Sequence, residues 1–190
     1  MKNYENVKTV IMNELKQVLD SIQVHEVEQF IQLIMTSKKV CGYGAGRMGY
    51  GLRAFMMRLN HLGIQASFIN DTYCPPLDSN DLFIVTSGSG ETKSVLEYLK
   101  IAKDHGIKTI AITGNRESTM ARTADSVVVF KSSNGGLNSA DSNSKINSIQ
   151  PMTSLNEQAM FVFFDILAVI LIDRLGISKK DEKKFHFNVE

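Results

Sequence analysis

The spacing of hydrophobic positions changes along the chain. Over residues 1–36 apolar side chains recur every three or four positions, which predicts two amphipathic helices at the N-terminus. After that, short runs rich in Val and Ile alternate with helix-like segments. Strands are predicted at 39–44, 64–69, 81–90 (with the turn that ends it), 107–113 and 125–130. Helices are predicted at 47–63, 91–106, 116–124 and 153–176.

Strands that alternate with helices, each strand a continuous apolar run, indicate a parallel sheet covered on both faces. We therefore expect a single α/β domain over residues 1–190, a three-layer sandwich of the flavodoxin-like type with five strands. The stretch 131–151 breaks the pattern, since it is rich in Ser, Asn and Gly and has no periodicity. It is either a disordered surface loop or a lid ahead of the last helix. Residues 177–190 form a polar tail.

The charge balance narrows the choice of partner. The chain has 21 Lys and Arg against 20 Asp and Glu, so no strongly basic surface for nucleic acid or an anionic membrane is expected. The N-terminus lacks the apolar centre of a signal peptide, and the apolar run 159–172 is shorter than the ~20 residues of a membrane span. Cys41 and Cys74 form neither a disulfide framework nor a metal site. We expect a cytoplasmic protein that uses no metal.

Two glycine-rich turns carry the candidate chemistry. Residues 44–49 read GAGRMG, a G-x-G-x-x-G pattern that fits a dinucleotide site, with Asp71 as the ribose acid, or any phosphate or close packing. In this turn Arg47 is either an anion contact or a solvated side chain.

Residues 87–92 read SGSGET, and this turn presents the Ser87, Ser89 and Thr92 hydroxyls with several backbone N–H groups, Gly88 included. Such donors at a helix N-terminus make a phosphate cradle, although Ser89 could be a plain N-cap. Glu91 is expected to face away from a phosphate.

The leading acid–base candidate is Glu157, at the head of the last helix. Ser154 and Glu157 also match a capping box, and the spacing alone leaves both interpretations open. His61 closes the helix 47–63, where the helix dipole favours a charged imidazole, so a dipole partner is the alternative to a site residue. His186 lies in the tail between two phenylalanines.

Several stretches in this order resemble the sugar isomerase (SIS) domain family: GYGAGRMG, MRLNHLG, TSGSGETKSV, QPMTSLNEQ and KKFHFNVE. The resemblance covers nearly the whole chain and is strongest to the 6-phospho-3-hexuloisomerase branch. It implies a five-stranded parallel sandwich, usually tetrameric, that needs no cofactor or metal. It also implies that Ser87, Ser89 and Thr92 hold a sugar phosphate, that Gly46 helps to shape the pocket, that Glu157 is the base and that His61 and His186 lie near the sugar, often across a subunit interface.

The expected reaction is the conversion of D-arabino-3-hexulose 6-phosphate to fructose 6-phosphate through an enediol. Three departures bear on the substrate: Met48 stands where the family commonly has Ser, Thr153 where it has Gly, and Asn156 where it has Phe. The alternatives are an isomerase for another phosphosugar, a phosphosugar sensor without catalysis, and an NAD-binding module. The helix at 159–172, apolar nearly all round, suggests a homo-oligomer.

Overall fold

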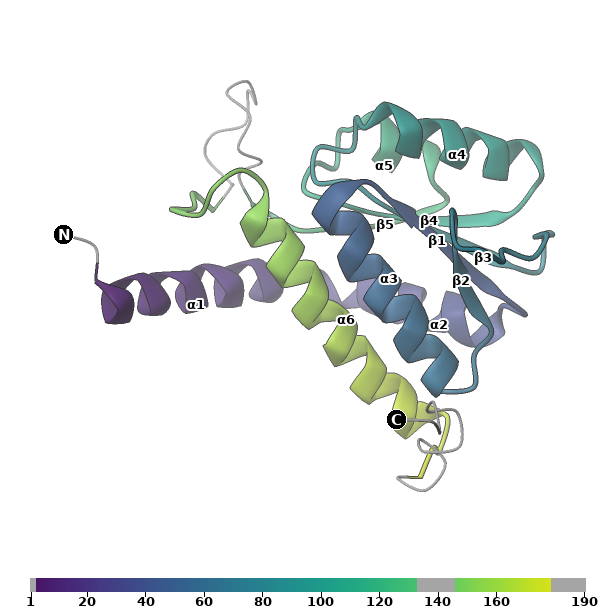
Figure 1. Cartoon of the computed structure of the whole chain (residues 1–190), viewed down its shortest axis with the longest axis horizontal. Coiled ribbons are helices and arrows are strands. Elements are labelled where there is room, and N and C mark those ends of the chain that lie inside the picture. The colour runs from purple at the N-terminus through teal and green to yellow at the C-terminus, as the bar shows by residue number, and fades with distance from the viewer. Residues whose placement is uncertain (1–2, 133–145, 179–190) are drawn as a thin grey trace.

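The computed structural model describes residues 3–132 and 146–178. In this part of the chain five parallel strands form one sheet in the order β2-β1-β3-β4-β5 (Figure 1). The strands are β1 (Val40–Gly44), β2 (Ala66–Phe68), β3 (Leu82–Thr86), β4 (Lys108–Thr113) and β5 (Ser126–Val129). The order changes direction between β1 and β3, the point at which doubly wound folds bind ligands. The predicted fold class is confirmed.

Helices cover both faces of the sheet, and an apolar core fills each side. Six helices are described: α1 (Tyr4–Asp20), α2 (Val24–Thr36), α3 (Gly46–His61), α4 (Lys93–Asp104), α5 (Thr119–Thr123) and α6 (Ser154–Arg174). Figure 1 shows α4 and α5 on one face and α2, α3 and α6 on the other. Successive residues of β3 point to opposite faces, so Leu82 and Ile84 join the core under α3 and α6, while Phe83 and Val85 join the core under α4.

The last helix, α6, lies within the predicted range 153–176 and extends beyond the apolar run 159–172 at both ends. Its 21 residues are long and apolar enough to cross a membrane by length and composition, yet half of the tested window is buried within the fold. Phe163 stacks on Phe30 of α2 and meets Phe130 edge-on, so this face of α6 belongs to the domain core. Phe161, Ile166 and Val169 on the opposite face remain exposed.

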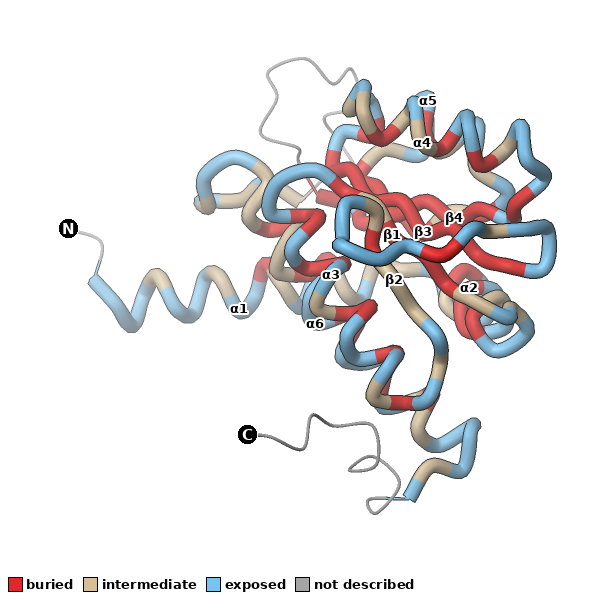
Figure 2. Tube along the Cα trace, turned by 45° about the vertical axis from the view of Figure 1, so that its right-hand side comes forward, coloured by how far each residue is buried: buried red, intermediate tan, exposed pale blue. Residues whose placement is uncertain are grey.

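A buried carboxylate ties α1 to the chain that enters α6. Glu14 accepts hydrogen bonds from Ser148 Oγ at 2.6 Å, Ile149 N at 2.9 Å and Gln150 Nε2 at 3.0 Å. Burial alone would raise the pKa of Glu14, but these three hydrogen bonds outweigh it and lower the pKa below its ordinary value. Most of the predicted polar loop 131–151, and nearly all of the tail 177–190, lie outside the described residues. The N-terminal half of α1 is largely exposed (Figure 2).

Candidate active site

The two glycine-rich turns lie side by side at the carboxyl edge of the sheet. Gly44, the last residue of β1, pairs in register with Thr86, the last residue of β3. A pocket of about 560 Å³ opens over these strand ends and reaches the start of α6. Its wall is formed by three segments of the chain: Ala45, Gly46, Arg47 and Met48; Thr86, Ser87, Gly88, Ser89 and Thr92; and Pro151, Met152, Thr153, Ser154 and Glu157.

The turn between β3 and α4 gathers hydroxyl groups. Ser87 Oγ lies 2.7 Å from Thr92 Oγ1 and 3.4 Å from Ser89 Oγ, and it accepts a hydrogen bond from Gly90 N at 3.1 Å. The N-cap of α4 is Thr92, so the interpretation of Ser89 as the N-cap is wrong. Hydroxyls and the positive end of a helix dipole together suit a phosphate group.

Glu91 faces away from this hydroxyl cluster. Its Oε1 accepts a hydrogen bond from Thr119 N, 2.7 Å away at the start of α5. The expectation that this carboxylate would not point at a phosphate is therefore confirmed, and Glu91 instead joins the turn to α5.

The glycines of the turn between β1 and α3 lie where parts of the chain pack closely. A Cβ on Gly49 would lie 2.1 Å from Gly44 O, and a Cβ on Gly44 would lie 2.2 Å from Thr86 Oγ1. Close packing therefore requires two of the three glycines, Gly49 where α3 meets β1 and Gly44 where β1 meets β3. Asp71, the acid that a dinucleotide site would need, does not line the pocket and pairs with Arg53 at 3.2 Å. The NAD interpretation finds no support in this geometry.

Glu157 enters the pocket from the first turns of α6. Its side chain is 12 % exposed, Oε1 accepts a hydrogen bond from Thr153 Oγ1 at 2.9 Å, and Oε2 accepts one from Arg47 Nε. The helix begins at Ser154 with Thr153 as its N-cap, so a capping box would pair Thr153 with Asn156. The capping-box interpretation of Ser154 and Glu157 is therefore wrong in register. Both carboxylate oxygens are held by side chains at the pocket.

The structure brings seven of the nine predicted site residues to this pocket and places one far from it. His61 is the last residue of α3, whose first residue, Gly46, lines the pocket. Fifteen helical steps of 1.5 Å put about 22 Å between the two ends. His61 can therefore approach a pocket of this kind only if the pocket belongs to another copy of the chain. His186 lies outside the described residues, so its predicted place near the sugar stays a prediction.

The sequence pattern did not single out every wall residue. Thr86, Pro151 and Met152 line the pocket; they stand in the stretches TSGSGETKSV and QPMTSLNEQ, but no role was predicted for them. Met48 and Thr153, two of the departures from the family pattern, also line it, whereas Asn156 is buried beside it and accepts a hydrogen bond from Ser132 Oγ. Within residues 3–132 and 146–178 no group of three His, Cys, Asp or Glu side chains could hold a metal ion.

The two cysteines lie apart from the pocket wall. Cys41 is buried in β1 and Cys74 is exposed, with 3.5 Å between the two sulfur atoms. Burial raises the pKa of the Cys41 thiol to about 12, so this group stays protonated near neutral pH. Neither thiol is placed to act on a ligand at the strand ends.

Comparison with known proteins agrees with this geometry. The SIS domain pattern matches residues 54–163, more than half of the chain. A Bacillus subtilis protein named 3-hexulose-6-phosphate isomerase is 36 % identical over 191 residues, and the alignment covers 100 % of both chains. A Methylomonas aminofaciens protein of the same name is 30 % identical over 190 residues, again covering 100 % of both chains.

A solved structure matches this fold over nearly the whole chain. The crystal structure of a Methanococcus jannaschii protein, from which a molecular function of 3-hexulose-6-phosphate isomerase was inferred, superposes on this chain with a TM-score of 0.81. It shares 28 % sequence identity, and the match covers 96 % of this chain and 98 % of the other. Family pattern, full-length relatives and superposition agree: the chain belongs to the SIS domain family.

Proposed function

We propose that this chain is a phosphosugar isomerase that converts D-arabino-3-hexulose 6-phosphate to fructose 6-phosphate. One observation carries the proposal: a carboxylate, Glu157, faces the same pocket as the hydroxyl-rich turn of Ser87, Ser89 and Thr92. A phosphate site with a base beside it is what an enediol isomerase needs. The names of the full-length relatives support the choice of substrate. The reaction requires no cofactor, and we place the enzyme in the cytoplasm.

The phosphate is held at the start of α4. The Ser87, Ser89 and Thr92 hydroxyls can turn to donate to its oxygens, and the N-terminus of the helix adds a favourable dipole. No lysine or arginine belongs to this turn, which suits a site that must also release a product of the same charge. The phosphate anchors one end of the open-chain sugar.

Glu157 transfers the carbon-bound proton. In the 3-hexulose the base removes the proton from C2, the electron pair forms the 2,3-enediol, and the proton returns to C3 as the carbonyl forms at C2. Thr153 holds Oε1, and Arg47 bonds Oε2 while two thirds of its own side chain is exposed. The exposed arginine is the more easily displaced partner, so Oε2 is the oxygen that receives the proton.

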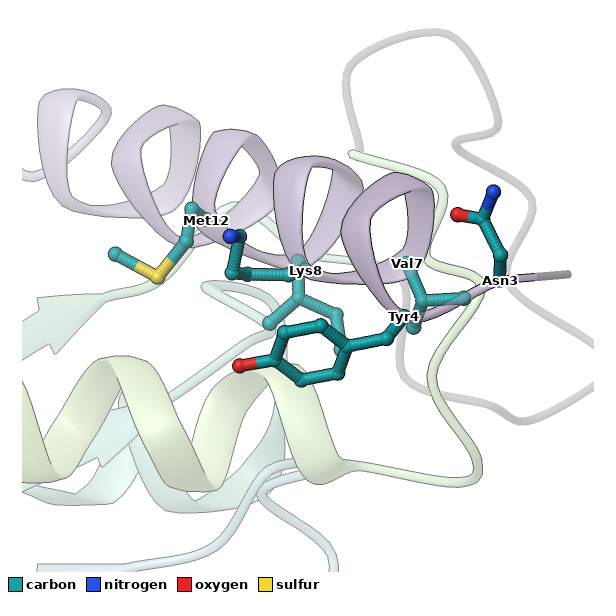
Figure 3. A pocket seen from close by; sticks show the side chains of 6 residues that line it. Asn3, Tyr4, Val7, Lys8 and Met12 are labelled. Atoms are coloured by element: carbon teal, nitrogen blue, oxygen red, sulfur yellow. The ribbon is translucent and has the colours of Figure 1, made fainter.

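We also propose a homo-oligomer, which the exposed apolar surface and the place of His61 support. The exposed face of α6 carries Phe161, Ile166 and Val169, which a second copy would cover. The free end of α1 adds an apolar depression lined by Tyr4, Val7 and its neighbours (Figure 3). In such an assembly His61 of one copy moves the oxygen-bound proton in the pocket of another. Sedimentation velocity at low and high micromolar concentration tests this, since a monomer at both would contradict it.

The first test is turnover by the purified wild type. The 3-hexulose 6-phosphate is formed in place from formaldehyde and ribulose 5-phosphate by a synthase, and the appearance of fructose 6-phosphate is followed. The Glu157→Gln variant keeps the shape of the side chain but removes the base, and its kcat is expected to fall by about 10³-fold or more while fructose 6-phosphate still raises its melting temperature.

The control is Glu91→Gln, because this carboxylate lies in the hydroxyl-rich turn before α4 but bonds to α5. Full activity of Glu157→Gln would contradict the proposed role of the carboxylate. A wild type that is stabilised by phosphosugars but converts none of them would be a sensor instead of an isomerase.

A further inference from the structure

The floor of the pocket holds a hydroxyl group that has no hydrogen-bond partner among the described residues. Thr86 is fully buried, and its Oγ1 has no hydrogen bond to any of the residues that the structure describes. A buried hydroxyl in this state destabilises the fold, because water solvated it in the unfolded chain and nothing replaces that water. A valine of nearly the same shape would avoid the penalty.

The neighbouring strand β1 leaves space for this hydroxyl. Gly44 pairs with Thr86 in the sheet, and a Cβ on Gly44 would lie only 2.2 Å from Thr86 Oγ1. The hydroxyl therefore occupies space that any residue other than glycine would fill. A strand-end glycine, Gly44, and an unpaired polar atom, Thr86 Oγ1, are therefore direct neighbours in the sheet. Both features are unfavourable for stability, and Thr86 lies on the wall of the pocket.

The direction of Thr86 separates it from the phosphate cradle. Along β3, Leu82 and Ile84 point to the face covered by α3 and α6, and Thr86 follows them in the alternation. Ser87 points to the other face, where it bonds Thr92 at the start of α4. Glu157 approaches from α6, on the same side of the sheet as Thr86.

We propose that Thr86 is a specificity-determining residue that hydrogen-bonds an oxygen atom on the sugar carbons of the ligand, not the phosphate. This inference rests on the proposed function for the identity of the ligand. The sugar offers hydroxyl and carbonyl oxygens at the carbons between the phosphate and Glu157, and a neutral donor and acceptor such as Thr suits them. The ligand supplies the partner that residues 3–132 and 146–178 do not provide.

The test uses opposite effects on stability and binding. Thr86→Val removes the hydroxyl, so the melting temperature of the unliganded protein is expected to stay the same or rise. The Kd of fructose 6-phosphate is expected to rise about tenfold, and kcat/KM to fall by a similar factor. The affinity for inorganic phosphate, measured by the same thermal titration, is expected to change by less than twofold.

Two further variants keep the outcome decisive. Thr86→Ser restores the hydroxyl and is expected to recover most of the affinity for fructose 6-phosphate. Thr86→Ala removes the hydroxyl without crowding Gly44, in case the valine methyl strains the strand. Ser87→Ala, by contrast, is expected to weaken inorganic phosphate and fructose 6-phosphate together.

Specific results would overturn the assignment. An unliganded Thr86→Ser variant that melts well above Thr86→Ala, which lacks the same buried methyl group, would mean that the hydroxyl bonds within the protein. Equal loss of phosphate and fructose 6-phosphate affinity would place Thr86 in the phosphate cradle. If the wild type converts no phosphosugar, the proposed function fails, while the ratio of the two affinities still decides the role of Thr86.

Discussion

The two glycine-rich turns of this protein need glycine for similar reasons and differ in the hydroxyl groups that surround the glycines. In the turn after β1, Gly44 and Gly49 let strand and helix backbones approach within the space of a side chain. In the turn after β3, Gly90 has φ +70°, which folds the serines back onto Thr92, and a Cβ there would lie 2.1 Å from Ser118 Oγ. Both turns are therefore closely packed, and only the second adds a cluster of hydroxyl donors.

This difference explains why the sequence pattern G-x-G-x-x-G was ambiguous. Glycine at these spacings reports that two backbones come close, but it does not say whether the second backbone belongs to a ligand or to the protein. Here the close partner of Gly49 is the carbonyl of Gly44 itself. The hydroxyls, which have no such structural need, are the more informative signal.

The largest expected effect is on stability and concerns Gly49. In a helix interior Gly→Ala normally stabilises by up to about 1 kcal/mol. In Gly49→Ala the new Cβ would lie 2.1 Å from Gly44 O, a clash with backbone that cannot rotate away. We expect a net loss of about 3 kcal/mol or more, measured as the free energy of unfolding in urea.

Gly51→Ala is the matched control on the same helix. Its Cβ would meet only the tip of Met160, at 2.8 Å, and a flexible methionine end can shift. Its unfolding free energy is expected to stay within about 1 kcal/mol of the wild type. Equal stability of Gly49→Ala and the wild type would refute the packing role of the first turn.

The second effect is on ligand binding and concerns Ser87. Ser87→Ala removes the hydroxyl that contacts Thr92 and Gly90 N, so the Kd of inorganic phosphate is expected to rise about tenfold. The free energy of unfolding is expected to fall by only about 1 kcal/mol, because Gly90 N keeps its second hydrogen bond, to the backbone oxygen of Ser87. Isothermal titration with phosphate measures the first value, and the exposed Ser79→Ala serves as the control. Unchanged phosphate affinity would remove the second turn from the binding site.

Local periodicity was enough to predict the sheet, its parallel strands and the helices on both faces, because each element buries its own apolar side. The hydroxyl turn was predictable for the same reason, since all of its members lie within six residues. The partners of Glu157 were not predictable, because Arg47 lies 110 positions away and Thr153 takes the N-cap place that the spacing assigned to Ser154. The unpaired hydroxyl of Thr86 depends on the register between two strands, which no local pattern contains.

The smallest expected effect concerns Gly46. Its substitution tests the backbone conformation of the first turn without disturbing any packing contact. Gly46 has φ +57°, and a Cβ added there would meet nothing within 4 Å. Gly46→Ala should therefore cost about 1 kcal/mol for the left-handed backbone and nothing for contacts. Gly106→Ala is the matched control, with φ +68° and equally open space but no place in the pocket.

Both variants are expected to lose a similar few degrees in melting temperature. Only Gly46→Ala adds a methyl group to the pocket wall, so it alone is expected to raise the KM for the phosphosugar, by a few-fold, while the affinity for inorganic phosphate stays unchanged. If Gly46→Ala instead lost phosphate affinity, the backbone of the first turn would have to bind the anion as well. The two turns would then share one function, and the division between packing and binding would no longer hold.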